Sequence, residues 1–280
     1  MVDRLAALLN RFSVSAHTFH AGALCGINVL EAREPYGQLH LIRGGTVEVH
    51  HDAGGPPLLI EEPSLLLYPR PLTHRFVTDA QQGANFVCAQ VEFEGGAANP
   101  IASTLPPWVC LPLHSVSACQ PVLQLLFEEA HAHNCGRQTV LDRLFEVVLV
   151  HVLRQLMEQG RVYGGMLAGM ADQRLRRALV AMHEAPESDW SLEALAAEAG
   201  MSRTVFATGF KDTLGCTPGQ YLQRWRIGLA QKLLRQGRSL KLIATDVGYG
   251  SEAALSRAFR AQTGMAPGSW RKDREPVGTT

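Results

Sequence analysis

The amino-acid sequence predicts a two-domain α+β protein, with a β-barrel or sandwich first and an all-helical domain after it. Three observations predict this class. Residues 18–93 contain many short strand patterns, helical periodicity replaces them after a proline-rich segment near residue 100, and a two-helix unit occurs twice beyond residue 190. A chain of 280 residues is long enough to form two cores.

The first domain is expected to be built from short strands. The segment "QLHLIRGGTVEVHH" divides into two strands at Gly44-Gly45, and "NFVCAQVEF" alternates apolar and polar residues as a half-buried strand does. Many short strands at this spacing favour a sandwich or a barrel.

Two helices are expected after the strands, over residues 121–133 and 139–160. The longer helix carries an apolar stripe of five residues, Leu141, Leu144, Val148, Val152 and Met157. Two interpretations stay open, because the stripe could pack on the protein's own sheet or the helix pair could form a dimer interface. The predicted boundaries are a first domain over residues 1–160, a glycine-rich linker over 161–171 and a second domain over 172–280.

The net charge is zero, but it is unevenly distributed along the chain. Residues 1–169 contain 10 basic and 15 acidic residues, whereas residues 170–280 contain 16 basic and 11 acidic residues. The basic excess of the second domain fits binding to a polyanion. No apolar run approaches the ~20 residues that span a bilayer, so we expect no membrane partner and a cytoplasmic protein with six reduced cysteines.

The duplicated unit consists of "LAAEAGMSRTVFATGFKDTLGCTP" and "IATDVGYGSEAALSRAFRAQTGMAP". In each copy a short helix ends at a glycine, Gly200 or Gly248, and a serine, Ser202 or Ser251, can cap the next helix. Two helices joined by a tight glycine-containing turn form a helix-turn-helix, whose second helix enters the major groove of DNA. The repeat therefore predicts two DNA-reading units.

The segment between the units predicts one helix that starts at Pro218 and stops at Gly237. About 20 residues at 1.5 Å each give a rod of roughly 30 Å. One turn of B-DNA is about 34 Å long, so the two units could reach adjacent major grooves on one face of the duplex. A helical repeat that binds a protein is the alternative.

The second helix of each unit should have a buried side and a base-reading side. The residues expected inside are Val205, Phe206, Phe210, Leu255 and Phe259. Those expected to face the bases are Arg203, Thr204, Ala207 and Thr208 in the first unit, and Glu252, Ala253, Ser256 and Arg257 in the second. Arg can pair with guanine, Glu can accept from cytosine, and Ala or Thr can touch a thymine methyl group. Phosphate contacts or a solvated face are expected for Arg224, Arg226, Lys232, Arg238, Lys241 and Arg260.

These motifs, from "LEALAAEAGMSRTVF" to "MAPGSWR", resemble the DNA-binding region of AraC/XylS-type transcription regulators. The resemblance implies a sequence-specific regulator of transcription and not an enzyme. We expect double-stranded DNA as its partner, a homodimer, and RNA polymerase as a further partner. One departure is Gly209, where the family usually has a larger, often basic residue; glycine should weaken the helix by up to ~1 kcal/mol.

The first domain, through segments such as "HLIRGGTVEVH" and "PLTHRF", resembles the cupin-like sensor domain of one branch of that family. Some members of this branch, which includes regulators that respond to reactive chlorine species, carry residues that match Cys25, His40, His74 and Cys88. The resemblance implies Zn²⁺ held between two sheets and thiols that respond to oxidation. Two thiolates and two imidazoles suit tetrahedral zinc, but two buried thiols and two structural histidines would look the same in the sequence.

Two alternatives remain for the first domain. It could sense a small organic ligand in an apolar interior lined by Leu66, Tyr68 and Phe86. It could also be a cupin metalloenzyme, because "PRPLTH" is similar to part of a cupin metal motif. The enzyme is the weaker alternative, since the HxH pair and the glutamate that complete an iron or manganese site are missing.

Overall fold

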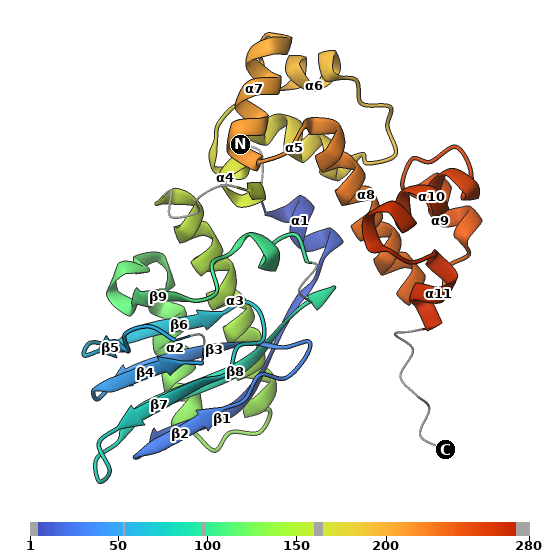
Figure 1. Cartoon of the computed structure of the whole chain (residues 1–280). Coiled ribbons are helices and arrows are strands. Elements are labelled where there is room, and N and C mark those ends of the chain that lie inside the picture. Colours follow the sequence, from blue (N-terminus) through green and yellow to red (C-terminus); the bar gives the residue numbers. More distant parts are fainter. Residues whose placement is uncertain (1–4, 53, 97–98, 160–164, 273–280) are drawn as a thin grey trace. The chain divides into compact units, whose positions relative to one another are not determined.

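The protein forms two compact units in the computed structural model, which describes residues 5–52, 54–96, 99–159 and 165–272 (Figure 1). One unit consists of Ser13–Val162, and the other combines Met1–Phe12 with Tyr163–Thr280. The first contains the strands and two long helices, and the described part of the second is helical. The predicted order, a β-rich domain before an all-helical one, is confirmed.

The strands of the first unit, between Val14 and Pro112, form a sandwich of two antiparallel sheets. The five-stranded sheet has the order β1 (Val14–Leu24), β8 (Ala84–Phe93), β3 (Gly37–Gly44), β6 (Ser64–Tyr68) and β9 (Val109–Pro112). The four-stranded sheet has the order β2 (Ile27–Leu30), β7 (His74–Thr78), β4 (Val47–His51) and β5 (Leu58–Ile60). The predicted break falls between β3 and β4, where Gly45 adopts a φ of +95°.

Strand β3 is buried on both faces because it lies in the middle of the larger sheet. Its inner face contributes Ile42 to an apolar cluster that includes Phe76 from the opposite sheet and Phe86 from β8. On the outer face, the Arg43 guanidinium lies 5.4 Å from the centre of the Phe127 ring. The strand is buried from Gly37 to Ile42, so it contributes both to the core and to the surface beneath the helices.

Short 3-10 turns (Ala102–Thr104, Leu113–Ser115 and Ser117–Cys119) lead into α2 (Gln120–His131) and α3 (Arg137–Glu158). Helix α3 packs against β1 and α2, across the outer face of the larger sheet (Figure 1). Four of the five predicted stripe residues are buried there, and Leu144 is half-buried. The stripe thus packs on the protein's own sheet, as the first of the two interpretations predicts.

The helical unit is built around one long central helix. Its helices are α1 (Ala6–Arg11), α4 (Gly165–Ala171), α5 (Leu175–Glu184), α6 (Leu192–Glu198), α7 (Arg203–Leu214), α8 (Pro218–Arg235), α9 (Leu240–Asp246), α10 (Glu252–Thr263) and α11 (Pro267–Lys272). Helices α6 and α7 form the first helix-turn-helix, and α9 and α10 form the second. Helix α8 joins them (Figure 1).

The glycine-rich segment differs from the predicted linker. Residues 160–164 lie outside the described part of the chain, but Gly165–Ala171 forms α4, which packs against α5 and α7. Met166 and Met170 are buried, and a Cβ placed on Gly169 would lie 2.7 Å from Leu179 Cδ1. The glycine therefore allows two helices to approach closely, and the prediction of a linker over 165–171 is wrong.

The N-terminal segment also differs from the predicted boundary, which assigned residues 1–12 to the first domain. Helix α1 packs against α5, and the Phe12 ring meets the Trp225 ring edge-on at 5.1 Å between centroids. Leu8 and Phe12 are buried, and the Arg11 guanidinium donates to the Glu184 carbonyl. An amphipathic segment this short needs a partner surface, and the helical unit supplies it.

Among the helices of the described ranges, none is both long enough and apolar enough to cross a membrane.

We predict that Phe12→Ala destabilises the helical unit. The ring is only 3% exposed, and removing such a side chain lowers the free energy of unfolding by about 3–5 kcal/mol. Thermal unfolding of the full-length protein followed by tryptophan fluorescence measures the change. Phe19→Ala is the matched control, because Phe19 is 44% exposed; equal effects of the two changes would contradict the packing described for Phe12.

Candidate functional site

The first recognition helix, α7, presents its predicted residues outward. The Ser202 hydroxyl accepts from the Val205 N–H and caps the helix, as expected. Arg203, Thr204 and Thr208 are exposed and Ala207 is half-buried. Phe206 and Phe210 are completely buried, so they fix the helix against its unit.

Val205 was expected in the core, but 53% of its surface is exposed. The reason is helical geometry: Phe206 and Phe210 are four residues apart and share the inner side, whereas Val205 lies about 100° away from Phe206. Val205 therefore stands with the outward residues of α7, where a methyl group can contact thymine.

The second recognition helix, α10, has the same construction. The Ser251 hydroxyl accepts from the Ala254 N–H, and Leu255 and Phe259 are completely buried. Of the four residues predicted to face the bases, Glu252, Ala253 and Arg257 are exposed and Ser256 is half-buried. The turns before both recognition helices use a glycine with positive φ, +63° at Gly200 and +77° at Gly248, as predicted.

Helix α8 fixes the spacing between the two helix-turn-helix units. It has 18 residues, hence a length of about 27 Å. Its start is fixed by a capping box, in which Thr217 and Gln220 each bond to the other's backbone N–H. The predicted start at Pro218 is confirmed, and Gly237, with φ +78°, follows its end.

Arg226 acts as an internal brace, although the sequence suggested a phosphate contact or a solvated position. Its guanidinium donates to the carbonyl oxygens of Pro186, Ser188 and Gly248 at 2.7, 2.9 and 3.2 Å. It thereby joins α8 to the loop before α6 and to the turn of the second helix-turn-helix. Arg226 is half-buried near Glu187 and Asp189. Only the tertiary structure brings these residues together, so the sequence alone could not show that Arg226 is internal.

The other predicted basic residues divide into two groups. Lys232 donates to the Arg11 carbonyl, and Arg238 forms an ion pair with Asp246 at 2.7 Å. Three residues remain exposed with their side chains available to phosphates, Arg224, Lys241 and Arg260. In the first unit, the Arg203 guanidinium pairs with Glu193 of α6 at 2.7 Å. Since both side chains are exposed, this pair is weak and leaves the Arg203 guanidinium available to another partner.

Inside the sandwich, the structure brings together two of the four predicted metal ligands. His40 on β3 and His74 on β7 are completely buried, and their Nε2 atoms are 3.1 Å apart. Two nitrogens bound to one tetrahedral zinc lie about 3.3 Å apart. His74 Nδ1 donates to the Leu72 carbonyl at 2.9 Å, which fixes the proton on Nδ1 and leaves Nε2 as an acceptor.

Burial keeps both imidazoles neutral. Desolvation lowers the pKa of His74 to about 4, and desolvation, with His74 and His20 nearby, lowers the pKa of His40 well below its usual value. Neutral imidazoles are the form that binds metals. His40 Nδ1 is buried and has no hydrogen-bond partner among the described residues.

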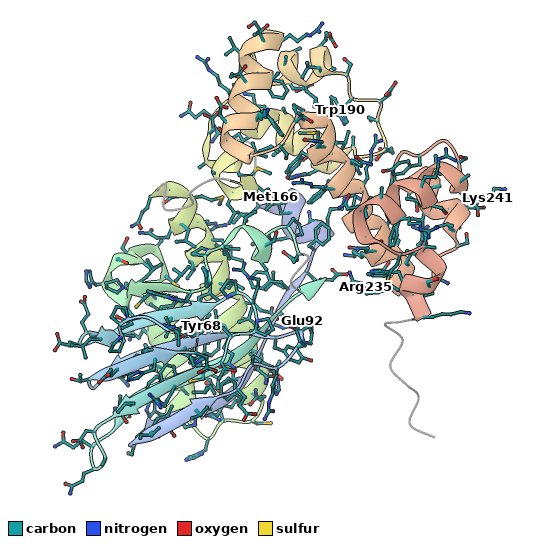
Figure 2. The ribbon with its side chains drawn as sticks, viewed as in Figure 1. Tyr68, Glu92, Met166, Trp190, Arg235 and Lys241 are labelled. Atoms are coloured by element: carbon teal, nitrogen blue, oxygen red, sulfur yellow. The ribbon has the colours of Figure 1, made fainter. Side chains whose placement is uncertain are left out.

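Aromatic rings surround this histidine pair. Tyr68, labelled in Figure 2, stacks on the His74 ring at 4.0 Å between centroids and shares a 2.9 Å hydrogen bond with His51. The Phe76 ring lies 5.0 Å from both histidine rings. These ring contacts limit the space in which the two imidazoles can turn.

The two predicted cysteine ligands lie apart. Cys88 is buried on β8 directly opposite His40 in the strand register, and burial raises the pKa of its thiol far above the usual value. Cys25 is exposed and lies beside Gly83, just before β8 begins. The four residues from Ala84 to Cys88 extend about 14 Å, too far for the two thiols to share one metal ion or one disulfide. In the part of the chain that the structure describes, no three His, Cys, Asp or Glu side chains already surround a metal position.

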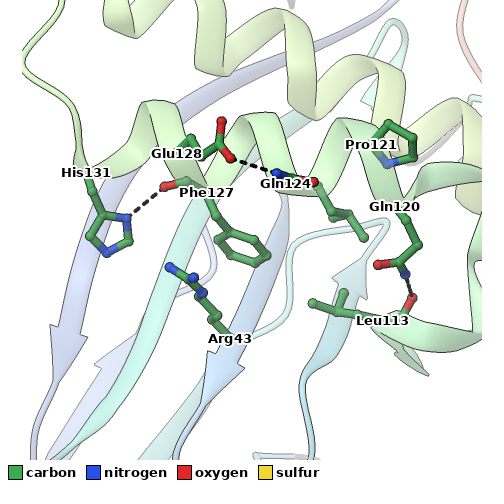
Figure 3. A pocket seen from close by; sticks show the side chains of 9 residues that line it. Arg43, Leu113, Gln120, Pro121, Gln124, Phe127, Glu128 and His131 are labelled. Atoms are coloured by element: carbon green, nitrogen blue, oxygen red, sulfur yellow. Dashed lines mark hydrogen bonds between the residues drawn. The ribbon is translucent and has the colours of Figure 1, made fainter.

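The residues expected to line an organic-ligand cavity belong to the core. Leu66, Tyr68 and Phe86 are at most 1% exposed. An open groove of about 650 Å³ lies instead on the outer face of the sandwich, between α2 and β3 (Figure 3). Arg43, Phe127 and Glu128 line it, and Gln124 donates to Glu128 along its rim.

Comparisons with known proteins agree with this architecture. Residues 3–158 match the family of domains described as cupin, and residues 195–273 match the helix-turn-helix domain family. The two match regions correspond to the sandwich with α1 and to the paired recognition units.

The chain is similar to several bacterial transcription regulators. An AraC-like transcription regulator of Streptomyces antibioticus is 39% identical over 188 residues, which cover 66% of this chain and 62% of that protein. One from Streptomyces lividans is 33% identical over 262 residues, 84% of this chain and 86% of that protein. The RCS-specific HTH-type transcriptional activator RclR of Escherichia coli K12 is 26% identical over 213 residues, 75% of each chain. The match to the first relative spans just under two thirds of its length.

We predict that Arg226→Ala lowers the free energy of unfolding by about 1–3 kcal/mol, because three carbonyl groups lose a charged donor. It should also weaken specific DNA binding, since the second unit loses its brace. Urea unfolding and a gel-shift assay measure the two effects. Arg224→Ala is the control, as Arg224 is exposed on the same helix; a stability loss as large as that of Arg226→Ala would contradict the role of the brace.

Acid should destabilise the helical unit through His183. This ring is completely buried, stacks on Trp225 at 3.9 Å between centroids and faces the Tyr221 hydroxyl at 2.7 Å. Burial lowers its pKa from 6.5 to about 3. The unfolded chain therefore takes up a proton between these values, and stability is lost as pH falls from 6.5 toward 3, by up to ~1.4 kcal/mol per pH unit.

The measurement is the unfolding free energy of the wild type and of His183→Gln between pH 3 and 8. The variant keeps a polar partner for Tyr221 but does not titrate, so its acid limb should be shallower. If the unfolding free energy of the two proteins fell equally with decreasing pH, His183 would not be buried in its neutral form.

Proposed function

The chain belongs to the AraC family of transcription regulators, and on this premise we propose that its two helix-turn-helix units read adjacent major grooves on one face of double-stranded DNA. The observation that carries the proposal is the pair of exposed recognition helices, α7 directly before α8 and α10 in the helix-turn-helix that follows it. The protein is a DNA-binding regulator with a cupin sensor domain and not an enzyme.

The length of α8 supports simultaneous binding. The helix is about 27 Å long, and the recognition helices lie beyond its ends, so a separation near the ~34 Å turn of B-DNA is reachable. Bases would be read by the outward residues of α7 and α10. The guanidinium groups of Arg203 and Arg257 can each pair with guanine through two hydrogen bonds, and Glu252 can accept from the cytosine amino group.

We further propose that the sandwich senses its signal through Zn²⁺. His40 and His74 offer two convergent neutral nitrogens, and Cys88 lies beside His40 in the register. Bound zinc would hold Cys88 as a thiolate, the form that oxidants attack, whereas the buried thiol alone is unreactive. An oxidant or the metal itself is the proposed signal; the relative that shares 26% identity is named as an RCS-specific activator.

We also propose that the protein forms a homodimer and contacts RNA polymerase. Beside its buried stripe, α3 exposes Val140 and Val147, and α2 exposes Leu125. These side chains are 39%, 41% and 47% exposed, and apolar groups on neighbouring helices favour association with a second copy. A dimer would double the number of reading units on one operator.

The groove between α2 and β3 favours a second candidate signal, a small organic anion. Arg43 provides a positive charge, and Phe127 provides an apolar wall. An anion that binds there would perturb α2 without touching the buried histidines. Zinc content that is unrelated to the response of the regulator would favour this alternative.

We predict that Arg203→Ala and Arg257→Ala each weaken binding to the selected operator by about 1–3 kcal/mol, roughly 5–150-fold. The operator is obtained by selection from genomic fragments, and affinity is measured by gel shift. Inserting five base pairs between the two half-sites turns one away by about half a helical turn and should abolish high-affinity binding. Arg154→Ala, an exposed change on α3, is the control.

Full affinity after the insertion would show that the two units do not act on one face of the duplex. Unchanged affinity of both arginine variants would remove these residues from the base-reading surface.

A further inference from the structure

Three neighbouring strands of the larger sheet place His20, Cys88 and His40 in one row. Cys88 on β8 pairs with His20 on β1 and, on its other side, with His40 on β3. Residues paired in this way project from the same face of a sheet, with Cβ atoms about 5 Å apart. Cys88 belongs to the apolar cluster between the sheets, so the row faces the interior.

A β-bulge in β1 gives His20 this position. The register shifts between Thr18 and His20, so that His20 rather than Phe19 stands opposite Cys88. A bulge re-aims the side chains that follow it. Leu24, four residues further along the same face, packs against the inner cluster, and His20 is itself half-buried.

The opposite sheet supplies a fourth group. His74 on β7 reaches across the sandwich, where its Nε2 atom lies 3.1 Å from that of His40. Cys88 thus has an imidazole on either side in its own sheet, and a third imidazole faces the row from the other sheet. Zinc accepts both imidazole nitrogen and thiolate sulfur, and four such groups complete its tetrahedral coordination.

We propose that His20, His40, His74 and Cys88 together bind one Zn²⁺, with His20 in the place that the sequence suggested for Cys25. This inference rests on the proposed function, which puts zinc in the sandwich, and it identifies the complete ligand set. Cys25 takes no part, because it is exposed and lies beside Gly83, before the start of β8 and away from Cys88.

His20 must turn to reach the metal. In the structure its Nε2 atom faces the Gly22 carbonyl at 3.3 Å, a long and weak hydrogen bond. Among the described residues, this is the one hydrogen bond that His20 loses when its side chain rotates toward Cys88. Burial and His74 lower the pKa of His40 most, and His20 is close enough to contribute as well.

Zinc content and affinity of the full-length protein test the ligand set. Metal is measured by mass spectrometry, and affinity is measured by competition with a chromogenic chelator. His20→Ala should bind zinc at least ~100-fold more weakly than the wild type, a loss larger than that for an outer-shell partner. Cys25→Ser and His17→Ala should each retain one zinc at wild-type affinity; His17 is an exposed histidine on the same strand.

Cobalt substitution adds an absorption signal that increases in one variant, and misfolding cannot imitate such an increase. Co²⁺ in the wild-type site should show a charge-transfer band of one thiolate, and Cys88→Ser should remove that band. His20→Cys should keep one metal ion and about double the band, because a second thiolate replaces an imidazole at the same position.

The outcomes separate this inference from the proposed function. Zinc bound equally by His20→Ala and the wild type, or lost in Cys25→Ser, would overturn the ligand set and leave zinc sensing in place. Absence of zinc and cobalt binding in the wild type would overturn both. Operator binding by His20→Ala, measured by gel shift, tests the helix-turn-helix units independently of the zinc site. His20 lies in the sandwich unit, whereas the helix-turn-helix residues lie in the helical unit.

Discussion

The burial of α8 is the constraint on which the DNA-binding unit depends. One 18-residue helix contributes to the cores of both helix-turn-helix units, and its apolar residues are covered by α7 at one end and by α9, α10 and α11 along the rest. Trp225 lies at the middle of this helix, packed by His183 and Phe12. Because a continuous hydrogen-bonded helix resists bending, the two recognition helices keep a fixed separation. Arg226 adds a polar brace at the same level.

The sandwich follows a different principle, since it places polar groups inside an apolar core. Neutral histidines are tolerated there because they bond to the Leu72 carbonyl and to each other. The stacked Tyr68 ring limits their movement. A buried polar cluster is costly for a purely structural core, and the proposed zinc site would offset that cost by using the two converging Nε2 atoms.

Local patterns predicted the elements well wherever the chemistry of a residue and its neighbours decides the backbone. Ser202 and Ser251 cap helices, and Gly200 adopts the turn conformation, because hydroxyl groups and glycine act on atoms three or four residues away. The prediction failed at Val205, whose burial depends on which side of α7 meets the rest of the unit. It failed again at Gly169, whose small size serves close helix packing rather than flexibility.

The sequence by itself determined the two-domain order, the twin helix-turn-helix units, the helix that separates them and the outward position of their reading residues. These follow from periodicity and capping, which act over a few residues. Only the tertiary structure decided that α1 belongs with the helical unit, that Arg226 is internal, that Cys25 is remote from His40, and that a bulge places His20 beside Cys88. Strand register and long-range packing join residues tens of positions apart, and no local pattern records which of them will meet.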